Sequence, residues 1–335
     1  ERRILINAVA PHWDGNQVWL ITAGGALFAA WPPVYATAFS GFYLAMMLTL
    51  AALFMRPIGF DYRSKLENPA WRSNWDWALT FGSAVPPIIF GVAFGNLLQG
   101  VPFHFDDLLR IYYTGSFWAL LNPFALLVGV LSLLMFINQG ACYLQMKTEA
   151  PLRQRAEAVS LISATLAAVL FVLAGIWLAS AGMGYKVTSL IDSNAINSAV
   201  TKTVEVSSGA WFSNYETYPL LWIFPVLGVA AFLLSAFCSK LAKGWQAFVA
   251  SSLALTGVIM TCGVSMFPFI MPSSSMPNHS LTMWDATSSE LTLKIMFVVA
   301  CIFVPIILGY TAWCYWKMWG RLNRNSISDN NHSLY

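Results

Sequence analysis

The chain has 335 residues, of which 58% are hydrophobic and only 10% are charged, and its formal net charge is +3 at pH 7. Soluble domains carry about 25% charged residues, and the mean hydropathy here is +0.62. The composition therefore excludes an ordinary soluble domain and predicts an integral membrane protein. The net charge gives no support for a nucleic-acid-binding protein, because the Lys and Arg residues are confined to short segments between apolar runs.

Apolar runs of roughly 17–25 residues cross a bilayer as helices. The sequence predicts an all-α, polytopic transmembrane helix bundle that forms a single integral membrane domain over residues 1–335. About eight spans are expected, at residues 18–31, 34–55, 77–98, 117–145, 159–180, 219–238, 245–270 and 291–319. Pro32-Pro33 predicts a tight turn between the first two spans, and Pro86-Pro87 suggests an interruption of the third. Gly24-Gly25 and the Gly91/Gly95 pair predict close helix packing.

The distribution of positive charge predicts the orientation, since cytoplasmic loops of membrane proteins are enriched in Lys and Arg. With both chain ends in the cytoplasm, all but four of the 18 Lys and Arg residues fall on the cytoplasmic side. Of these four, Arg110, Lys186 and Lys202 lie in external loops and Lys294 lies within the last span. The main external loops are predicted at residues 181–218 and 271–290.

A polar cluster opens the first span. Asp14, Asn16 and Gln17 lie within one helical turn at its cytoplasmic start, and Asp61 lies at the cytoplasmic end of the second span. If these spans form a hairpin, both acids emerge on the same side of the membrane, where two carboxylates with an amide pair can pass protons inward. The alternative is structural: Asp14 caps the helix, and Asp61 pairs with Arg63 on a solvated loop.

Other side chains near these helix ends also have two interpretations. Arg56 either snorkels to the membrane interface or holds a cofactor propionate. Trp19 either lines an apolar conduit for a small gas or quinone, or fills a gap in the core. The Trp-Asp pairs at 13–14, 75–76 and 284–285 each precede a span. An interfacial Trp and a helix-capping Asp explain these pairs without any chemistry.

The sequence predicts no catalytic residue and no metal ligand in this chain. His12, His104, His279 and His332 lie in loops or at span ends, whereas membrane redox proteins usually hold haem through histidines, which would have to lie mid-helix to clasp a buried porphyrin. The five Cys residues lie within apolar segments and lack metal-ligand spacing.

Several stretches of the sequence carry a family resemblance. They are PHWDGNQVW (11–19), AAWP (29–32), RPIGFDYR (56–63), GVAFGNLLQGVPF (91–103), FPFIMPSS (267–274), SLTMWDATSS (280–289) and HSLY (332–335). Together they resemble subunit 2 of the cytochrome bd ubiquinol oxidases over the whole chain. That family opens with a further hydrophobic helix ending in a Gly-Phe-Asp motif, which has no counterpart here, so its nine spans would become eight.

The resemblance implies a respiratory function that the chain performs with a partner. In this family a larger subunit carries haem b, haem d and the quinol-oxidising loop. The two subunits together oxidise ubiquinol, reduce dioxygen to water and take protons from the cytoplasm. The resemblance thus implies a haem-free chain in the bacterial inner membrane, and it allows a structural ubiquinone and small single-span subunits as further partners.

The resemblance also gives roles to individual residues. Asp14 and Asp61 match acids of a cytoplasmic proton pathway, and Asn16 and Gln17 adjoin Asp14. Trp13 and Arg56 match positions that support the haem region, and Trp19 matches a position near an oxygen route. Helix capping by Asp14 is compatible with its proton role, because a cap needs only one carboxylate oxygen.

Two other classes of function remain as alternatives at this stage. One is a stand-alone proton-coupled membrane transporter, and the other is a scaffold without a proton role. Transporters place charged groups or unwound helices near the bilayer midplane, and no charged residue of this sequence lies near the middle of a predicted span.

Overall fold

The computed structural model describes residues 1–181, 183–189 and 200–323. Position 182, positions 190–199 of the predicted loop 181–218, and the C-terminal residues 324–335 with Arg324, His332 and the HSLY ending lie outside the described residues. The α-helices are α1 (Arg2–Val9), α2 (Trp13–Ala30), α3 (Pro32–Gly41), α4 (Tyr43–Tyr62), α5 (Pro69–Gln99), α6 (Pro123–Lys147), α7 (Leu152–Ser180), α8 (Ser213–Thr217), α9 (Ile223–Lys240), α10 (Gly244–Met266) and α11 (Glu290–Lys317).

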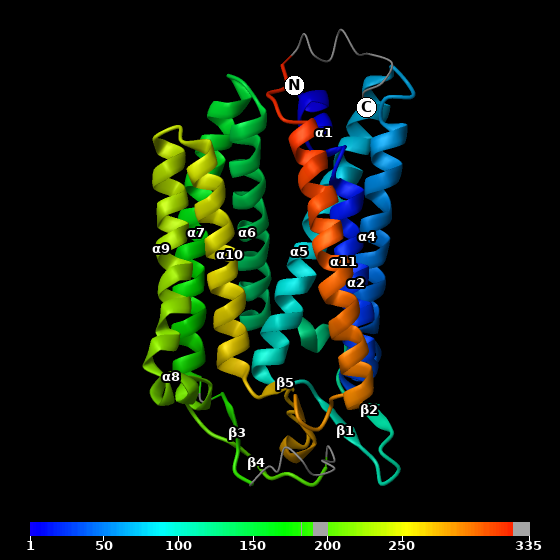
Figure 1. The fold of residues 1–335 in the computed structure, drawn as a ribbon, viewed down its shortest axis with the longest axis vertical. Coiled ribbons are helices and arrows are strands. Elements are labelled where there is room, and N and C mark those ends of the chain that lie inside the picture. The colour runs from blue at the N-terminus through cyan, green and yellow to red at the C-terminus, as the bar shows by residue number, and fades with distance from the viewer. Residues whose placement is uncertain (182, 190–199, 324–335) are drawn as a thin grey trace.

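The long helices run side by side along the longest axis of the molecule (Figure 1). Seven of them are long and apolar enough to cross a membrane: α4, α5, α6, α7, α9 with the preceding 3-10 turn, α10 and α11. This confirms the predicted polytopic helix bundle. The first predicted span corresponds to the 18-residue α2, which lies beside α11 in Figure 1. The polar first turn makes α2 as a whole less apolar than the most apolar stretch of each of these seven helices, so α2 is not one of them.

Two predictions about proline pairs are wrong. Pro32-Pro33 does not form a tight turn but occupies the first two positions of the separate helix α3, so the next span begins at Tyr43. Proline suits the first turn of a helix because its missing N–H has no partner there in any case. Pro86 and Pro87 do not interrupt α5, which continues through both residues to Gln99, and neighbouring helices make such prolines tolerable in a span.

The helices α6, α7, α9 and α10 form one tightly packed group (Figure 1). Small side chains dominate where these helices meet, which lets the backbones approach closely. The buried cluster between them consists of Leu131, Met135, Ala164, Ala167, Ala168, Ala231, Phe232, Ala236, Ala254 and Val258. The helices α4 and α5 pack beside this group, with α5 against α6. There the predicted Gly91/Gly95 contact is confirmed, because a Cβ atom at Gly95 would lie 2.7 Å from the Cα atom of Ala125.

Hydrogen bonds between side chains also join this group across its interior. The Asn138 carbonyl oxygen accepts from the Ser160 hydroxyl at 2.8 Å, and its amide nitrogen donates to Ser251 at 3.1 Å. Ser160 lies 2.9 Å from Ser239, which accepts from the Gln145 amide at 3.0 Å. Pairing these groups removes the cost of exposing them to an apolar environment, and it fixes which faces of the four helices meet.

Short strands and turns cover the end of the bundle opposite α1 (Figure 1). Three antiparallel pairs occur among the described residues: β1 (Phe103–Phe105) with β2 (Ile111–Tyr113), β3 (Tyr185–Val187) with β4 (Val204–Val206), and β5 (Phe269–Met271) with β6 (Leu281–Thr282). The 3-10 turns are Trp118–Leu121, Ala210–Phe212, Pro219–Trp222 and Pro277–His279. The two loops that we predict to be external contain half of these elements, while β1 and β2 lie in the connection between α5 and α6. The backbone N–H of Val204 in one loop donates to the side chain of Asn278 in the other at 2.8 Å.

Candidate functional site

The predicted site residues lie on two helices at the same end of the bundle. Trp13, Asp14, Asn16 and Gln17 occupy the first turns of α2, and Asp61 lies in the last turn of α4. Since α2 starts and α4 finishes at the end that also carries α1 (Figure 1), the two acids share that end. Arg56 lies five residues earlier on α4, about one and a half turns, and Trp19 follows further along α2.

Asp14 is exposed in the first turn of α2 but does not cap it. The N-cap residue is His12, whose side chain makes no capping hydrogen bond, and Asp14 is the second residue of the helix. The capping interpretation is therefore wrong. A carboxylate in the first turn is still stabilised there by the partial positive charge of the helix N-terminus.

The start of α2 is connected to α11 through Tyr315. The Asn16 amide donates to the Tyr315 hydroxyl at 3.1 Å, and the rings of His12 and Tyr315 stack with their centroids 3.8 Å apart. Partial burial and the nearby positive charge of Lys147 lower the pKa of His12 below its ordinary value. The imidazole is therefore neutral near pH 7.

Two buried polar atoms beside Asp14 have no hydrogen-bond partner among the described residues. They are Nε2 of His12 and Oε1 of Gln17. Buried polar groups are nearly always paired, with protein or with ordered water. A carboxylate, an imidazole nitrogen and an amide oxygen thus belong to residues at one helix start, and the two unpaired buried atoms call for water molecules there.

Arg56 packs against aromatic side chains of the same helix pair. Its guanidinium carbon lies 5.9 Å from the centre of the Trp13 ring, and Trp13 packs on Phe60 at 5.1 Å. The Nε–H of Arg56 is buried and unpaired within the part of the chain that the structure describes. This donor fits an anionic or carbonyl group that approaches from outside the chain.

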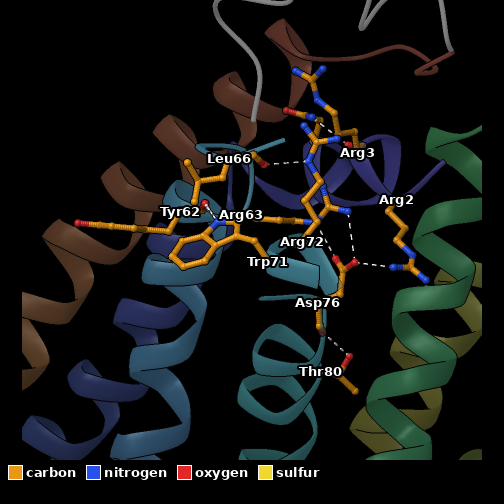
Figure 2. Close-up of polar contacts among 10 residues, drawn as sticks. Arg2, Arg3, Tyr62, Arg63, Leu66, Trp71, Arg72, Asp76 and Thr80 are labelled. Atoms are coloured by element: carbon orange, nitrogen blue, oxygen red, sulfur yellow. Dashed lines mark hydrogen bonds and ion pairs between the residues drawn. The ribbon is translucent and has the colours of Figure 1, made fainter. Parts of the chain in front are cut away.

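Asp61 does not pair with Arg63, so the ion-pair interpretation of Asp61 is wrong. Asp61 is exposed, whereas Arg63 is buried and binds the carboxylate of Asp76 at 2.6 Å and 3.3 Å. Arg2 contacts the same carboxylate at 2.6 Å from α1 (Figure 2). Arg2, Arg63 and Asp76 therefore fasten α1, the end of α4 and α5 together.

The three Trp-Asp pairs have no common capping role. Asp76 lies inside α5 and binds two arginines. Asp285 binds Lys202 at 2.6 Å, with side chains only 4% and 5% exposed, while the N-cap of the following helix is Ser289. Each of these two aspartates thus makes a tertiary ion pair. The sequence contained no local signal for them, because Arg2 and Lys202 are far from their partners along the chain.

Trp19 and the Gly24-Gly25 pair lie on the outer surface of the described chain. Trp19 is 36% exposed, so it does not fill a gap in the core of this chain. A Cβ atom added at Gly24 or Gly25 would meet nothing within 4 Å, so the predicted close packing is wrong within this chain. Both observations leave these positions of α2 free for contacts with lipid or with another chain.

The described histidines are distributed over both ends of the bundle. His104 stacks on Tyr112 in the β1–β2 hairpin, and Nδ1 of His279 accepts from the backbone N–H of Phe105 at 3.0 Å. His12 lies at the opposite end of the bundle. Within residues 1–181, 183–189 and 200–323 there is no group of three or more His, Cys, Asp or Glu side chains that could hold a metal ion.

Comparison with known proteins identifies similar chains. Residues 1–318 match the family described as cytochrome bd terminal oxidase subunit II. The "probable cytochrome oxidase subunit 2" of Haemophilus influenzae is 61% identical over 335 residues, which are all of this chain and 88% of that protein. The cytochrome bd-I ubiquinol oxidase subunit 2 of Escherichia coli is 58% identical with the same coverage. The cytochrome bd ubiquinol oxidase subunit 2 of Bacillus subtilis is 33% identical over 319 residues, 94% of this chain and 84% of that protein.

Proposed function

Since the chain belongs to the cytochrome bd terminal oxidase subunit II family and is thus a subunit of a bacterial respiratory ubiquinol oxidase, we propose a specific role for it within that complex. It admits protons from the cytoplasm through Asp14 and Asp61. Because the chain belongs to this family, we no longer retain the alternative of a stand-alone transporter. The haems of the complex, which transfer electrons to dioxygen, belong in this proposal to the larger partner subunit.

One observation carries the proton-entry proposal: an exposed carboxylate lies in sequence between two residues whose buried polar atoms lack partners within the described chain. Asp14 is exposed to solvent, and the buried His12 Nε2 and Gln17 Oε1, which have no partner among the described residues, belong to residues two positions before it and three positions after it. Water molecules bound to these atoms would continue a path from Asp14 inward. Asn16 orients the path through its bond to Tyr315, and Asp61 supplies a second exposed acid at the same end.

Arg56 and Trp13 are positioning residues in this proposal. The guanidinium of Arg56 is held over the Trp13 ring, while its Nε–H stays unpaired within the described chain. An acceptor group near the haems of the partner would complete that hydrogen bond. Trp19, exposed on α2, lies on the surface through which we propose that oxygen reaches the haem region.

The surface of the last helix supports a large partner. No residue of α11 is buried, although this helix is long and apolar enough to cross a membrane. A helix that is apolar on all sides is surrounded by lipid or protein. We place the haem-bearing subunit against α11 and α2, with the end that carries α1 facing the cytoplasm, as the predicted charge distribution requires.

The test is the Asp14→Asn exchange in the assembled complex. Removing the ionisable group while keeping the size of the side chain should slow quinol oxidation about 100-fold, the scale of a lost proton-transfer step. Asp14→Glu should restore much of the rate. Asp107→Asn is the matched control, because Asp107 is also exposed but lies in the hairpin at the opposite end.

Haem absorption of the purified complex shows whether each variant assembles. Full turnover in an assembled Asp14→Asn complex would contradict the proposal and favour the scaffold interpretation. Equal losses in Asp14→Asn and Asp107→Asn would also contradict it, because the effect would then not be specific to the proposed entry.

A further inference from the structure

We propose that a cavity at the cytoplasmic ends of α6, α10 and α11 binds the phosphoglycerol headgroup of an anionic phospholipid. The cavity has a volume of about 490 Å³ and lies between the end of α6, the start of α7, the α9–α10 turn and the end of α11. A phospholipid headgroup fits a cavity of this size at the membrane interface.

The described side chains that line the cavity include four cations and no acid. Lys147, Arg153, Lys243 and Arg321 line it, and none of its described lining residues is an Asp or Glu. Arg153 is partly used by its ion pair with Glu157 at 3.0 Å, and Lys147 donates to the carbonyl of Met318 at 2.7 Å. An ammonium group has three donors, so Lys147 keeps two of them for a ligand. Lys243 and Arg321 make no ion pair within the described residues.

The N-terminus of a long helix faces the same cavity. The 23-residue α10 begins at Gly244, and its N-cap residue Lys243 makes no side-chain capping hydrogen bond. The first N–H groups of a helix lack intrahelical partners, and with the helix dipole they attract a phosphate. Gly244 and Trp245 from this first turn line the cavity together with the lysine side chains.

A buried acceptor indicates that the ligand also donates hydrogen bonds. Gln145 lines the cavity, is only 1% exposed, and has an unpaired Oε1 atom, while its amide nitrogen is used by Ser239. A phosphodiester group cannot satisfy this oxygen, because its oxygen atoms only accept hydrogen bonds. The glycerol hydroxyls of a phosphoglycerol headgroup can. The ammonium of a zwitterionic headgroup is disfavoured beside four cationic side chains.

Two tryptophans place the cavity at the membrane interface. Trp245 and Trp319 line it with exposures of 59% and 67%, and their rings lie 6.4 Å apart. Tryptophan is enriched at the level of lipid headgroups. Exposed apolar residues such as Leu253 on α10 and Trp313 on α11 lie towards the span interior and offer a surface for acyl chains.

The experiment titrates the assembled complex in detergent with short-chain phosphatidylglycerol and measures bound lipid by native mass spectrometry. Lys243→Gln and Arg321→Gln should each weaken binding about fivefold, since one cation near a lipid headgroup contributes about that factor. Lys240→Gln is the matched control: Lys240 is exposed and ends α9 but does not line the cavity. It should change binding less than about twofold.

Different ligands distinguish the sources of the phosphate. We expect phosphatidylglycerol to bind more tightly than phosphatidylethanolamine, phosphatidic acid, glycerol phosphate or inorganic phosphate. Binding of glycerol phosphate as tight as that of the lipid would overturn the lipid assignment, and tighter binding of phosphatidic acid would overturn the glycerol contact with Gln145. Equal weakening by Lys240→Gln would reduce the effect to general surface charge and refute the site. None of these outcomes depends on the Asp14 proposal.

Discussion

Burial rather than distance should decide which ion pairs stabilise this protein, and the pair Lys202–Asp285 gives the sharpest test. The N–O distance is 2.6 Å both in this pair and in Lys294–Glu290. The side chains of the first pair are 5% and 4% exposed, whereas those of the second are 71% and 82% exposed. The two pairs therefore differ mainly in their solvent environment.

The perturbation is Asp285→Asn. In the native chain one carboxylate oxygen of Asp285 accepts from the Thr282 backbone N–H at 2.8 Å, and the other contacts Lys202. Asparagine keeps an acceptor for Thr282 but leaves the ammonium of Lys202 buried without its carboxylate. Breaking a buried pair in this way costs about 3–5 kcal/mol, whereas an exposed pair spaced i,i+4 contributes about 0.3–0.5 kcal/mol.

The assay is thermal unfolding of the purified complex in detergent, with Glu290→Gln as the control. At about 2 °C per kcal/mol for a chain of this size, Asp285→Asn should lower the midpoint by about 6–10 °C and Glu290→Gln by less than about 1 °C. The double change Lys202→Met with Asp285→Leu should recover most of the loss, because it removes both charges. Equal shifts in the two single variants would refute the reasoning.

Two further predictions concern packing and pH. Gly95→Ala should destabilise the complex by about 1–3 kcal/mol through overpacking, since its Cβ would lie 2.7 Å from Ala125 Cα. Gly24→Ala has open space around it and should leave the thermal stability of the isolated chain unchanged or slightly raised. A larger loss of stability for Gly24→Ala than for Gly95→Ala would contradict the packing argument. Burial lowers the pKa of His12 below 6.5, so the folded state binds fewer protons at this residue than the unfolded state. The contribution of His12 to the free energy of unfolding is therefore complete above pH 6.5 and declines as the pH falls below that value. His12→Gln should flatten this acid part of the stability profile, and an unchanged profile would show that His12 does not cause it.

The sequence predicted the parts of this fold that depend on local composition. Long apolar runs identified the seven helices that are long and apolar enough to cross a membrane, since each run satisfies the length requirement by itself. The spacing of Gly91 and Gly95 indicated a close helix contact correctly. The same reasoning failed at Gly24 and Gly25, because a small-residue pattern shows that a close approach is allowed and not that a neighbouring helix is present in the same chain.

Predictions that required a partner from elsewhere in the chain were less successful. Asp76 and Asp285 resemble local caps because each follows a tryptophan before an apolar run, yet Arg63 and Lys202 bind them through tertiary contacts. Pairings of this kind depend on the helix arrangement. The interior bonds of Asn138 could likewise not be predicted, because its Ser partners on three other helices form no sequence pattern until the helices meet.

The two halves of the bundle differ in how far they bury their apolar side chains and pair their polar ones, and the proposed proton entry lies in the half with less burial and pairing. The group α6, α7, α9 and α10 buries its own apolar cluster and satisfies Asn138 internally. By contrast, α11 buries no residue and α2 buries only Ala30. On or next to α2 and α4, buried atoms of His12, Gln17 and Arg56 have no hydrogen-bond partner within the part of the chain that the structure describes. A partner subunit that covers this side would bring acceptors and bound water to those atoms. The path from Asp14 would then be completed only on assembly, which couples proton delivery to the presence of the haem-bearing chain.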